Sequence, residues 1–255
     1  MGLTRLELLG DKIKLKSGAK LLLGGLSLVL TLSGCLYPGE EKRDSVNYRE
    51  SVKRIQGAID DYQQQEGVLP ILNADETVPR YEKFRIDLEK LTTSGYLDDI
   101  PATAFEEGGS AYFLILNEEI DPAVKVMDLI TVQKVNDVQL QIDRYKSAHG
   151  GALPVDNELY PGLYTIDHKK AGTGSITLNS VYSGQKLDFI MDPEGTVYVD
   201  YVFDIMAAIE KNGGEHEETK DLRHHLEEAS YYVPVKSLPY LWINNQPVPQ
   251  TPSSS

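Results

Sequence analysis

The sequence predicts an α+β fold with two related helix-plus-small-sheet units after a signal peptide. Three observations support this expectation: a short apolar run preceded by lysines at the N-terminus, two amphipathic helical patterns about 83 residues apart, and β-like segments with turn signals after each helix. The expected segments are a signal peptide at 1–34, a tether at 35–43, a first α+β unit at 44–128, a second unit at 129–212, a C-terminal helix and strand at 213–245 and a disordered tail at 246–255.

The N-terminal segment differs in composition from the rest of the chain. Four lysines (Lys12, Lys14, Lys16 and Lys20) precede an apolar run of 11 residues, LLLGGLSLVLT, that begins at Leu21. A helix needs ~20 apolar residues to cross the hydrocarbon core of a bilayer, so this run is too short for a permanent span. Positive charge before a short apolar run is the pattern of a secretory signal peptide.

The sequence Leu32-Ser33-Gly34-Cys35 follows the apolar run and resembles the lipobox of bacterial lipoprotein precursors. The resemblance implies that the Cys35 thiol receives a diacylglyceryl group, that the chain is cut before Cys35, and that the lipid holds the protein on the outer face of a cell membrane. A buried structural cysteine or an uncleaved anchor is the alternative. Cys35 is the only cysteine of the chain, so acylation would leave no thiol for catalysis, metal binding or a disulfide.

Charge also divides at the predicted cleavage point. The chain as a whole has a formal net charge of −14, and the predicted signal peptide contains five basic and two acidic residues, which leaves −17 on the remainder. So acidic a surface repels phosphate backbones and anionic lipid headgroups. We therefore expect no nucleic-acid partner, and attachment to the membrane that depends on the acyl chains, at ~0.8 kcal/mol per buried methylene.

Two helical patterns form the basis of the predicted units. The first places apolar residues at Val52, Ile55, Ile59 and Tyr62, and the second at Val132, Val135, Val138, Ile142 and Tyr145. Ile59 begins the sequence IDDYQQQEGVLP and Ile142 begins IDRYKSAHGGALP, so Ile, Asp, Tyr, Gly, Leu and Pro recur in the same order. We interpret the match as an internal duplication. The alternative is that any helix ending at Gly and then Pro has this appearance.

β-like sequence follows both helices. The expected strands are Ala111–Leu116 and Val124–Met127 in the first unit, Ser175–Leu178, Leu187–Ile190 and Thr196–Val199 in the second, and Tyr240–Ile243 near the C-terminus. The turn Asp192-Pro193-Glu194-Gly195 predicts a hairpin. Further helices are expected around 84–91, 201–211 and 219–229.

A family resemblance rests on several short stretches of the chain: the lipobox followed by Leu36-Tyr37-Pro38, ATAFEEGGSAYFLI from Ala102, VKVMDL from Val124, YSG from Tyr182, VYVDY from Val197 and SLPY from Ser237. In these stretches the chain resembles the YphF group of uncharacterised Bacillus lipoproteins. The resemblance implies a membrane lipoprotein. It implies no activity, because none is established for the group.

Four residues of one polar segment are weak candidates for metal binding: His216, Asp221, His224 and His225. On a helix, Asp221 would face His224 and His225 at i+3 and i+4. The helical zinc pattern His-Glu-x-x-His is absent, however, and HEETKDLRHHLEE is equally typical of a solvated helix face. The sequence therefore favours the solvated face, and no metal or other cofactor is expected.

Other motifs indicate turns and surfaces rather than catalysis. The glycines and hydroxyls of AGTGS from Ala171 precede a strand, whereas a phosphate loop requires a helix N-terminus. The Gly-x-Ser-x-Gly pattern of α/β hydrolases is absent. The carboxylates of Asp60, Asp61 and Asp143 lie near the polar ends of amphipathic helices and are expected to face solvent.

Aromatic composition gives the most specific binding candidate. The chain has 15 tyrosines against five phenylalanines and one tryptophan. A tyrosine offers a flat apolar face and a hydroxyl, which suits contact with sugars or peptides. The cluster Tyr231, Tyr232, Tyr240 and Trp242 is therefore a possible ligand surface, and half-buried packing in a small sheet is the alternative explanation.

These observations favour a non-catalytic, membrane-anchored interaction module that binds a protein or glycan of the envelope. The alternatives are a solute-binding lipoprotein of a transporter, in which two lobes would enclose a ligand, and an envelope hydrolase with catalytic residues scattered along the sequence. A cleft between the two halves favours the first alternative, and titratable residues that converge in a pocket favour the second.

Overall fold

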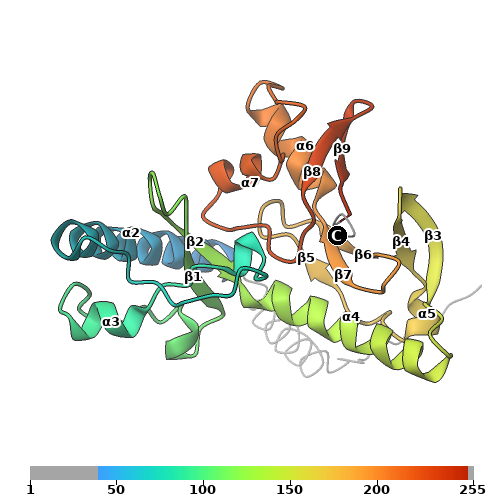
Figure 1. Ribbon diagram of the computed structural model, residues 1–255, viewed down its shortest axis with the longest axis horizontal. Helices are drawn as coiled ribbons and strands as arrows, with labels where there is room; N and C mark the ends of the chain where they lie inside the picture. The colour runs from blue at the N-terminus through green and yellow to red at the C-terminus, as the bar shows by residue number, and fades with distance from the viewer. Residues whose placement is uncertain (1–39, 252–255) are drawn as a thin grey trace, which may run out of the picture. The chain divides into compact units, whose positions relative to one another are not determined.

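The computed structural model describes the backbone of residues 40–251 and the side chains of residues 47–251 (Figure 1). The predicted signal peptide, Cys35 and residues 36–39 of the predicted tether lie outside these residues. The fold is mixed α+β, with helices and several small antiparallel sheets. In the described part of the chain, no helix combines the length and the apolar character that a membrane crossing requires.

The first long helix, α2 (Glu40–Glu66), begins earlier than the sequence predicts. Residues 40–43 belong to this helix rather than to a tether, because Glu, Lys and Arg are strong helix formers and acids favour a helix N-terminus. The predicted apolar positions form its buried face, with Ile55 and Ile59 fully buried. The helix ends where the left-handed conformation of Gly67, at φ +71°, turns the chain.

The hairpin of β1 (Ala111–Leu116) and β2 (Ala123–Asp128) packs against α2. The connecting segment contains three short helices, η1 (Arg80–Glu82), α3 (Leu88–Thr93) and η2 (Phe105–Glu107). Apolar side chains of α2, α3, β1 and β2 form one buried cluster, the first core, which contains Ile55, Ile59, Leu91, Phe113, Ile115 and Val126.

The second long helix, α4 (Leu129–Ala148), follows β2 directly, and the carboxylate of Asp128 caps its first turn. A five-stranded antiparallel sheet follows. In this sheet β4 (Leu163–Ile166) pairs with β3 (Val155–Tyr160) and with β6 (Lys186–Met191), which also pairs with β5 (Leu178–Asn179) and β7 (Val197–Asp200). The short helix α5 (His168–Ala171) lies between β4 and β5.

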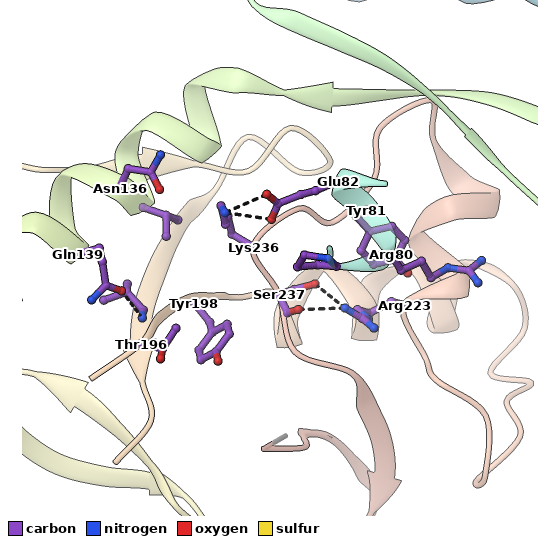
Figure 2. Close-up of a pocket in the computed structure, with 13 residues that line it drawn as sticks. Arg80, Tyr81, Glu82, Asn136, Gln139, Thr196, Tyr198, Arg223, Lys236 and Ser237 are labelled. Atoms are coloured by element: carbon purple, nitrogen blue, oxygen red, sulfur yellow. Dashed lines mark hydrogen bonds and ion pairs between the residues drawn. The ribbon is translucent and has the colours of Figure 1, made fainter. Parts of the chain in front are cut away.

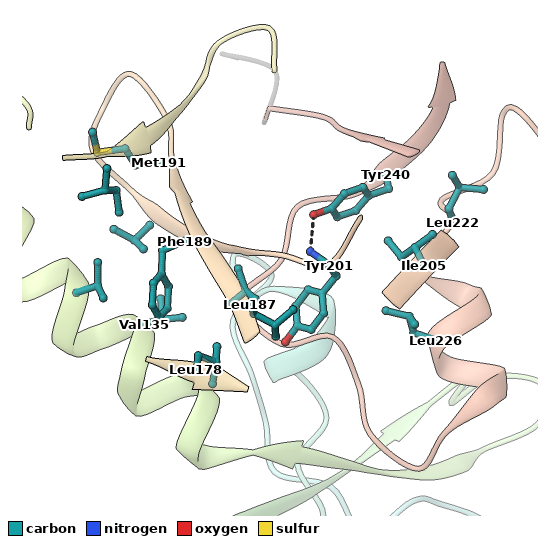
Figure 3. Close-up of a cluster of buried hydrophobic side chains, with 14 of the residues drawn as sticks. Val135, Leu178, Leu187, Phe189, Met191, Tyr201, Ile205, Leu222, Leu226 and Tyr240 are labelled. Carbon is teal, nitrogen blue, oxygen red and sulfur yellow. Dashed lines mark hydrogen bonds between the residues drawn. The ribbon is translucent and has the colours of Figure 1, made fainter. Parts of the chain in front are cut away.

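The second core lies between α4 and this sheet (Figure 3). It contains Val135, Val138 and Ile142 from the helix and Phe189, Met191, Val197 and Val199 from the strands. Helices α6 (Val202–Lys211) and α7 (His224–Ala229) complete it with Ile205, Ile209 and Leu226. The described residues from Val46 onward form one compact unit.

The sequence predicts the positions of β1, β2, β6 and β7 closely. It does not predict β3 and β4. Their sequence, VDNELYPGLYTI, has a Pro-Gly turn, but the outer strand β3 has mostly exposed side chains and therefore no run of apolar residues. The predicted strand at 175–178 is reduced to Leu178–Asn179, and α7 begins at His224 rather than near residue 219.

Equivalent glutamines connect each long helix to its hairpin. The Gln56 amide nitrogen donates to Asp60 Oδ1 at 2.8 Å and to the Pro122 carbonyl at 2.9 Å, and its oxygen accepts from the Val124 backbone N–H at 2.8 Å. Gln139 makes the same three contacts, to Asp143 Oδ1 at 3.0 Å, to the Gly195 carbonyl at 2.9 Å and from the Val197 N–H at 2.8 Å. Each glutamine lies three residues before the isoleucine of the shared I-D-x-Y sequence.

A second pair of contacts repeats after each helix. The backbone N–H of Asp87 donates to the Pro70 carbonyl at 2.8 Å, and that of Asp167 donates to the Pro154 carbonyl at 2.7 Å. Each of these aspartates then caps a short helix, α3 or α5, by accepting from backbone N–H groups of its first turn.

The C-terminal segment runs beside the last strand of both hairpins. The Val126 N–H of β2 donates to the Tyr231 carbonyl at 2.8 Å, and the Val199 N–H of β7 donates to the Lys236 carbonyl at 2.8 Å. Val233 and Val235 pack with Leu114, Leu116 and Met127 of the first hairpin. Leu238 packs with Ile190 of the second sheet.

The predicted disordered tail is wrong for its first residues. Strand β9 (Gln246–Pro249) pairs with β8 (Tyr240–Ile243), and Val248 is buried. Asn244 and Asn245 both have positive φ, at 51° and 63°, as a two-residue type I′ hairpin turn requires. The prolines that indicated disorder are tolerated because a hairpin strand has an outer edge that needs no N–H donor.

Candidate functional site

The predicted aromatic surface does not form as one surface. Tyr240 is fully buried, its hydroxyl donates to Asp200 Oδ1 at 2.9 Å and accepts from the Tyr201 N–H at 2.9 Å, and Figure 3 shows the latter contact. Trp242 packs against the second core, whereas Tyr231 and Tyr232 pack against the first. Packing therefore accounts for these four residues, and Tyr240 is excluded from any ligand surface.

A cavity of ~340 Å³ lies where three parts of the chain meet. We call it the junction cavity (Figure 2). Residues 79–82 at η1 form one wall, Val135, Asn136 and Gln139 of α4 and residues 196–198 at β7 form another, and Arg223, Lys236 and Ser237 come from the C-terminal segment. Its volume falls at the small end of the ~300–1,000 Å³ that is usual for ligand sites.

Tyr81 of the η1 wall is only 3% exposed. The guanidinium carbon of Arg223 lies 4.7 Å from the centre of its ring, and that of Arg80 lies 5.8 Å away. The Tyr81 hydroxyl donates to a carboxylate oxygen of Glu227 on α7. Burial raises the pKa of Tyr81, so the phenol is a neutral donor.

The charges of the junction cavity are balanced by ion pairs. Arg223 is 7% exposed and donates to both carboxylate oxygens of Asp221 and to the Ser237 carbonyl. Lys236 Nζ lies 2.9 Å from a carboxylate oxygen of Glu82, and Arg80 lies 3.3 Å from Glu227. With three cations paired to three carboxylates, the cavity does not attract anions by excess charge.

Hydrogen-bonding groups that are not ionised complete the opposite wall. Burial, followed by the charge of Asp192, raises the pKa of the Tyr198 hydroxyl to about 12, so this group is also neutral. Asn136, which is exposed, and Thr196 are also part of the lining. Two phenol rings, two guanidinium groups, two amides and hydroxyls therefore line the cavity, together with the ion pair of Lys236 and Glu82.

The candidate metal ligands separate into two groups. The carboxylate of Asp221 accepts from Arg223 and from the Tyr240 N–H, and the ring centre of His216 lies 3.9 Å from that of Trp242, with the two rings tilted. His224 and His225 lie together, with ring centres 4.0 Å apart. Burial, followed by the neighbouring His224, lowers the pKa of His225. The sequence did not single out Glu228, which joins these two histidines.

The segment AGTGS and the carboxylates of Asp60 and Asp143 lie in a turn and on exposed helix faces. Gly172 ends α5 at φ +70°, and the buried Thr173 hydroxyl lies 2.8 Å from His168 Nδ1, so AGTGS closes a short helix. Asp60 and Asp143 are exposed, and each accepts from the glutamine of its own helix. The glutamines that hold them contact different hairpins, so the two carboxylates are not brought together as a pair.

Sequence reasoning missed the residues of the junction cavity, because its walls come from positions more than 150 residues apart. Tyr81 and Glu82 lie in the short helix η1 after Pro79, where the sequence has no periodic pattern, and Lys236 lies in a segment without helix or strand. Lys236 has a positive φ of 58°, an unusual conformation for a lysine that only the folded chain reveals.

Comparison with known proteins identifies one part of the chain. Residues 48–128 match the family model of the YphF family N-terminal domain. No curated protein and no solved structure matches the chain. The matched span contains most of α2 and ends with β2, so it covers nearly all of the predicted first unit at 44–128. The chain therefore carries a YphF family N-terminal domain at residues 48–128.

Proposed function

We propose that this protein is a membrane-anchored, extracytoplasmic binding module without catalytic activity of its own, and that the junction cavity receives a sugar ring of an envelope glycan. The carrying observation is a lining whose cations are all paired with carboxylates and in which Tyr81 and Tyr198 lie among guanidinium, amide and hydroxyl groups. Sugars are neutral, present flat apolar faces to aromatic rings and exchange many hydrogen bonds. The formal net charge of −14 disfavours binding to the phosphate backbone of a nucleic acid.

The chemistry of the lining supports binding rather than hydrolysis. Glycoside hydrolysis usually requires two carboxyl groups on either side of the bond. Among the described residues that line the junction cavity, Glu82 is the one carboxylate, and it is paired with Lys236. The Ser237 hydroxyl donates to the Pro234 carbonyl, and the lining contains no histidine that could act as its base.

We further propose that two related units form this module, one at 44–128 and one at 129–212. Support comes from the matched contacts of Gln56 and Gln139, the matched caps of Asp87 and Asp167, and the burial of both repeat isoleucines against their own hairpins. The lipobox and signal peptide support an anchor through diacylglycerol on Cys35 at the outer face of the membrane.

A blocking variant tests the cavity with little risk to the fold. Asn136 is exposed on α4, so Asn136→Trp should fill the cavity mouth and leave the core intact. Gln133→Trp, one turn earlier on the same helix and outside the lining, is the matched control. In calorimetric titrations of the detergent-solubilised chain with soluble cell-wall glycan fragments, Asn136→Trp should weaken binding by at least about tenfold, and Gln133→Trp should not.

Peptides of similar length serve as competing ligands in the same titration. Binding of peptides but not of glycans would overturn the glycan assignment and identify an envelope protein as partner. Equal binding by both tryptophan variants would exclude the cavity as the site.

A solute-binding lipoprotein is the second candidate, because residues of both predicted units line the cavity. A monosaccharide or amino acid would then raise the Tm as strongly as a polymer does. For the interaction module, the longer glycan should bind more tightly than its single unit.

A further inference from the structure

We propose that His224, His225 and Glu228 form a binding site for a zinc-like divalent transition metal. One ligand atom from each of these three residues lies within 4.8 Å of the other two. His224 and Glu228 are four residues apart and share a face of α7, while His225 reaches the same point from the buried side. The site is separate from the junction cavity. Arg223 lines that cavity and Glu227 contacts its residues Tyr81 and Arg80.

The buried imidazole of His225 is the independent observation that points to a ligand. The residue is only 5% exposed, yet neither its Nδ1 nor its Nε2 has a hydrogen-bond partner. Buried polar atoms in native proteins are nearly always paired, so two unpaired nitrogens on one ring require an explanation. A metal ion bonded to one of them would supply the missing partner.

The second histidine is already oriented as a metal ligand. His224 Nδ1 lies 2.8 Å from the Asp221 carbonyl oxygen, which can only accept, so Nδ1 must carry the proton. The lone pair of a neutral ring is then on Nε2. A histidine that donates its other nitrogen to a carbonyl is the usual arrangement around protein-bound metals, because that contact fixes the tautomer and the ring orientation.

The donor set selects the class of metal. Two imidazole nitrogens and one carboxylate oxygen suit zinc and its transition-metal neighbours, whereas magnesium and calcium prefer oxygen ligands alone. Two ligands of a tetrahedral zinc lie about 3.3 Å apart at Zn–N and Zn–O bonds of about 2.0 Å. Because Glu228 is exposed, rotation of its side chain can close the remaining distance. The fourth position is left to water.

The test measures zinc affinity of the full chain, purified in detergent without a histidine tag and stripped with a chelator. Titration against a chromogenic zinc chelator should give one site. His224→Gln and Glu228→Gln should each weaken it by at least about tenfold. Millimolar magnesium should not displace the zinc. The matched controls are His149→Gln and Glu218→Gln, which alter an exposed histidine and an exposed glutamate away from the cluster.

The choice of an exposed residue distinguishes a loss of zinc binding from a loss of stability. His225 is buried, so its substitution also tests stability, and the exposed Glu228 therefore decides the outcome. Zinc should raise the Tm of the wild-type protein and of both controls, and raise that of Glu228→Gln less. Absence of saturable zinc binding, or equal affinity in all four variants, would overturn the proposal.

Discussion

At the scale of single residues, Gln56 and Gln139 are the clearest link between helix and hairpin. Each amide satisfies a backbone carbonyl at the hairpin turn and a backbone N–H at the start of its second strand. Both backbone partners of each glutamine lie beside a core and would lose their hydrogen bonds if the amide were removed. These side chains therefore fix the position of each helix along the strands of its hairpin.

Gln139→Ala should lower the free energy of unfolding by about 2 kcal/mol, because the N–H of Val197 and the carbonyl of Gly195 would lose their partners. Gln56→Ala should cost a similar amount through Val124 and Pro122. Urea denaturation measures both effects, with the exposed Gln64→Ala as a control within about 0.5 kcal/mol. A large cost for one glutamine and none for the other would contradict their equivalence.

Asp200 should make stability depend on pH. Burial raises the pKa of this carboxyl, although the Val202 N–H and the hydroxyls of Tyr160 and Tyr240 donate to it. The folded state therefore holds the proton at pH values where the unfolded state has released it, so stability falls as pH rises from about 3.9 through the folded pKa.

Asp200→Asn removes this titration. Its amide oxygen can replace Oδ1, which accepts from the Tyr240 hydroxyl and the Val202 N–H, and the Tyr160 hydroxyl, which donates to Oδ2, then has to accept from the amide NH2 instead. Its free energy of unfolding relative to wild type should therefore improve as pH rises through that window, when both are measured by urea denaturation at a series of pH values. Parallel pH profiles for the two proteins would disprove the assignment.

At the scale of elements, the β8–β9 hairpin completes the second core from the C-terminal end. Truncation after Asn245 removes β9 and its buried Val248, and should lower the free energy of unfolding by about 2–3 kcal/mol, the usual value for a buried valine. Truncation after Gln250 keeps β9 and is the control, expected within about 0.5 kcal/mol of wild type. Equal thermal stability of the two truncated chains would show that β9 contributes nothing.

The long helices α2 and α4 should respond alike to loss of their central isoleucines. Ile59 and Ile142 are both fully buried, each among the strands of its own hairpin. Ile59→Ala and Ile142→Ala should therefore each cost ~2–5 kcal/mol in denaturant unfolding. Asp60→Asn and Asp143→Asn, at the next position of each exposed face, should stay within about 0.5 kcal/mol. Tolerance of either alanine substitution would argue against equivalent helices.

At the scale of the whole molecule, we predict that the protein is anchored through Cys35. Cys35→Ser leaves no sulfur to acylate, so the precursor should stay uncut and without lipid. Mass spectrometry of the N-terminal peptide from a membrane fraction should find diacylglyceryl on Cys35 of the wild-type protein and residues 1–34 still attached in the variant. An unmodified Cys35 in a wild-type chain that keeps those residues would refute the anchor.

Local sequence patterns predict most of the helices and strands but few residues of the candidate site. The apolar periodicity of α2 and α4 predicted their buried faces, because a helix repeats every 3.6 residues whatever its surroundings. The apolar spacing also predicts a helix around 84–91, and the helix found there is Leu88–Thr93. In contrast, the strand β3 has little apolar sequence of its own and forms by pairing with β4. Propensity alone cannot detect such a strand.

The sequence by itself determined the α+β class, the two long helices, the hairpins after them and the acidic charge, since each depends on residues close together in the chain. Only the tertiary structure decided that Tyr240 belongs to a core, that Tyr81 and Tyr198 share a cavity, and that His225 is buried beside His224. The reason is physical. Burial and pairing of a side chain depend on contacts between distant segments, and composition places a tyrosine or histidine equally well in a core or on a surface.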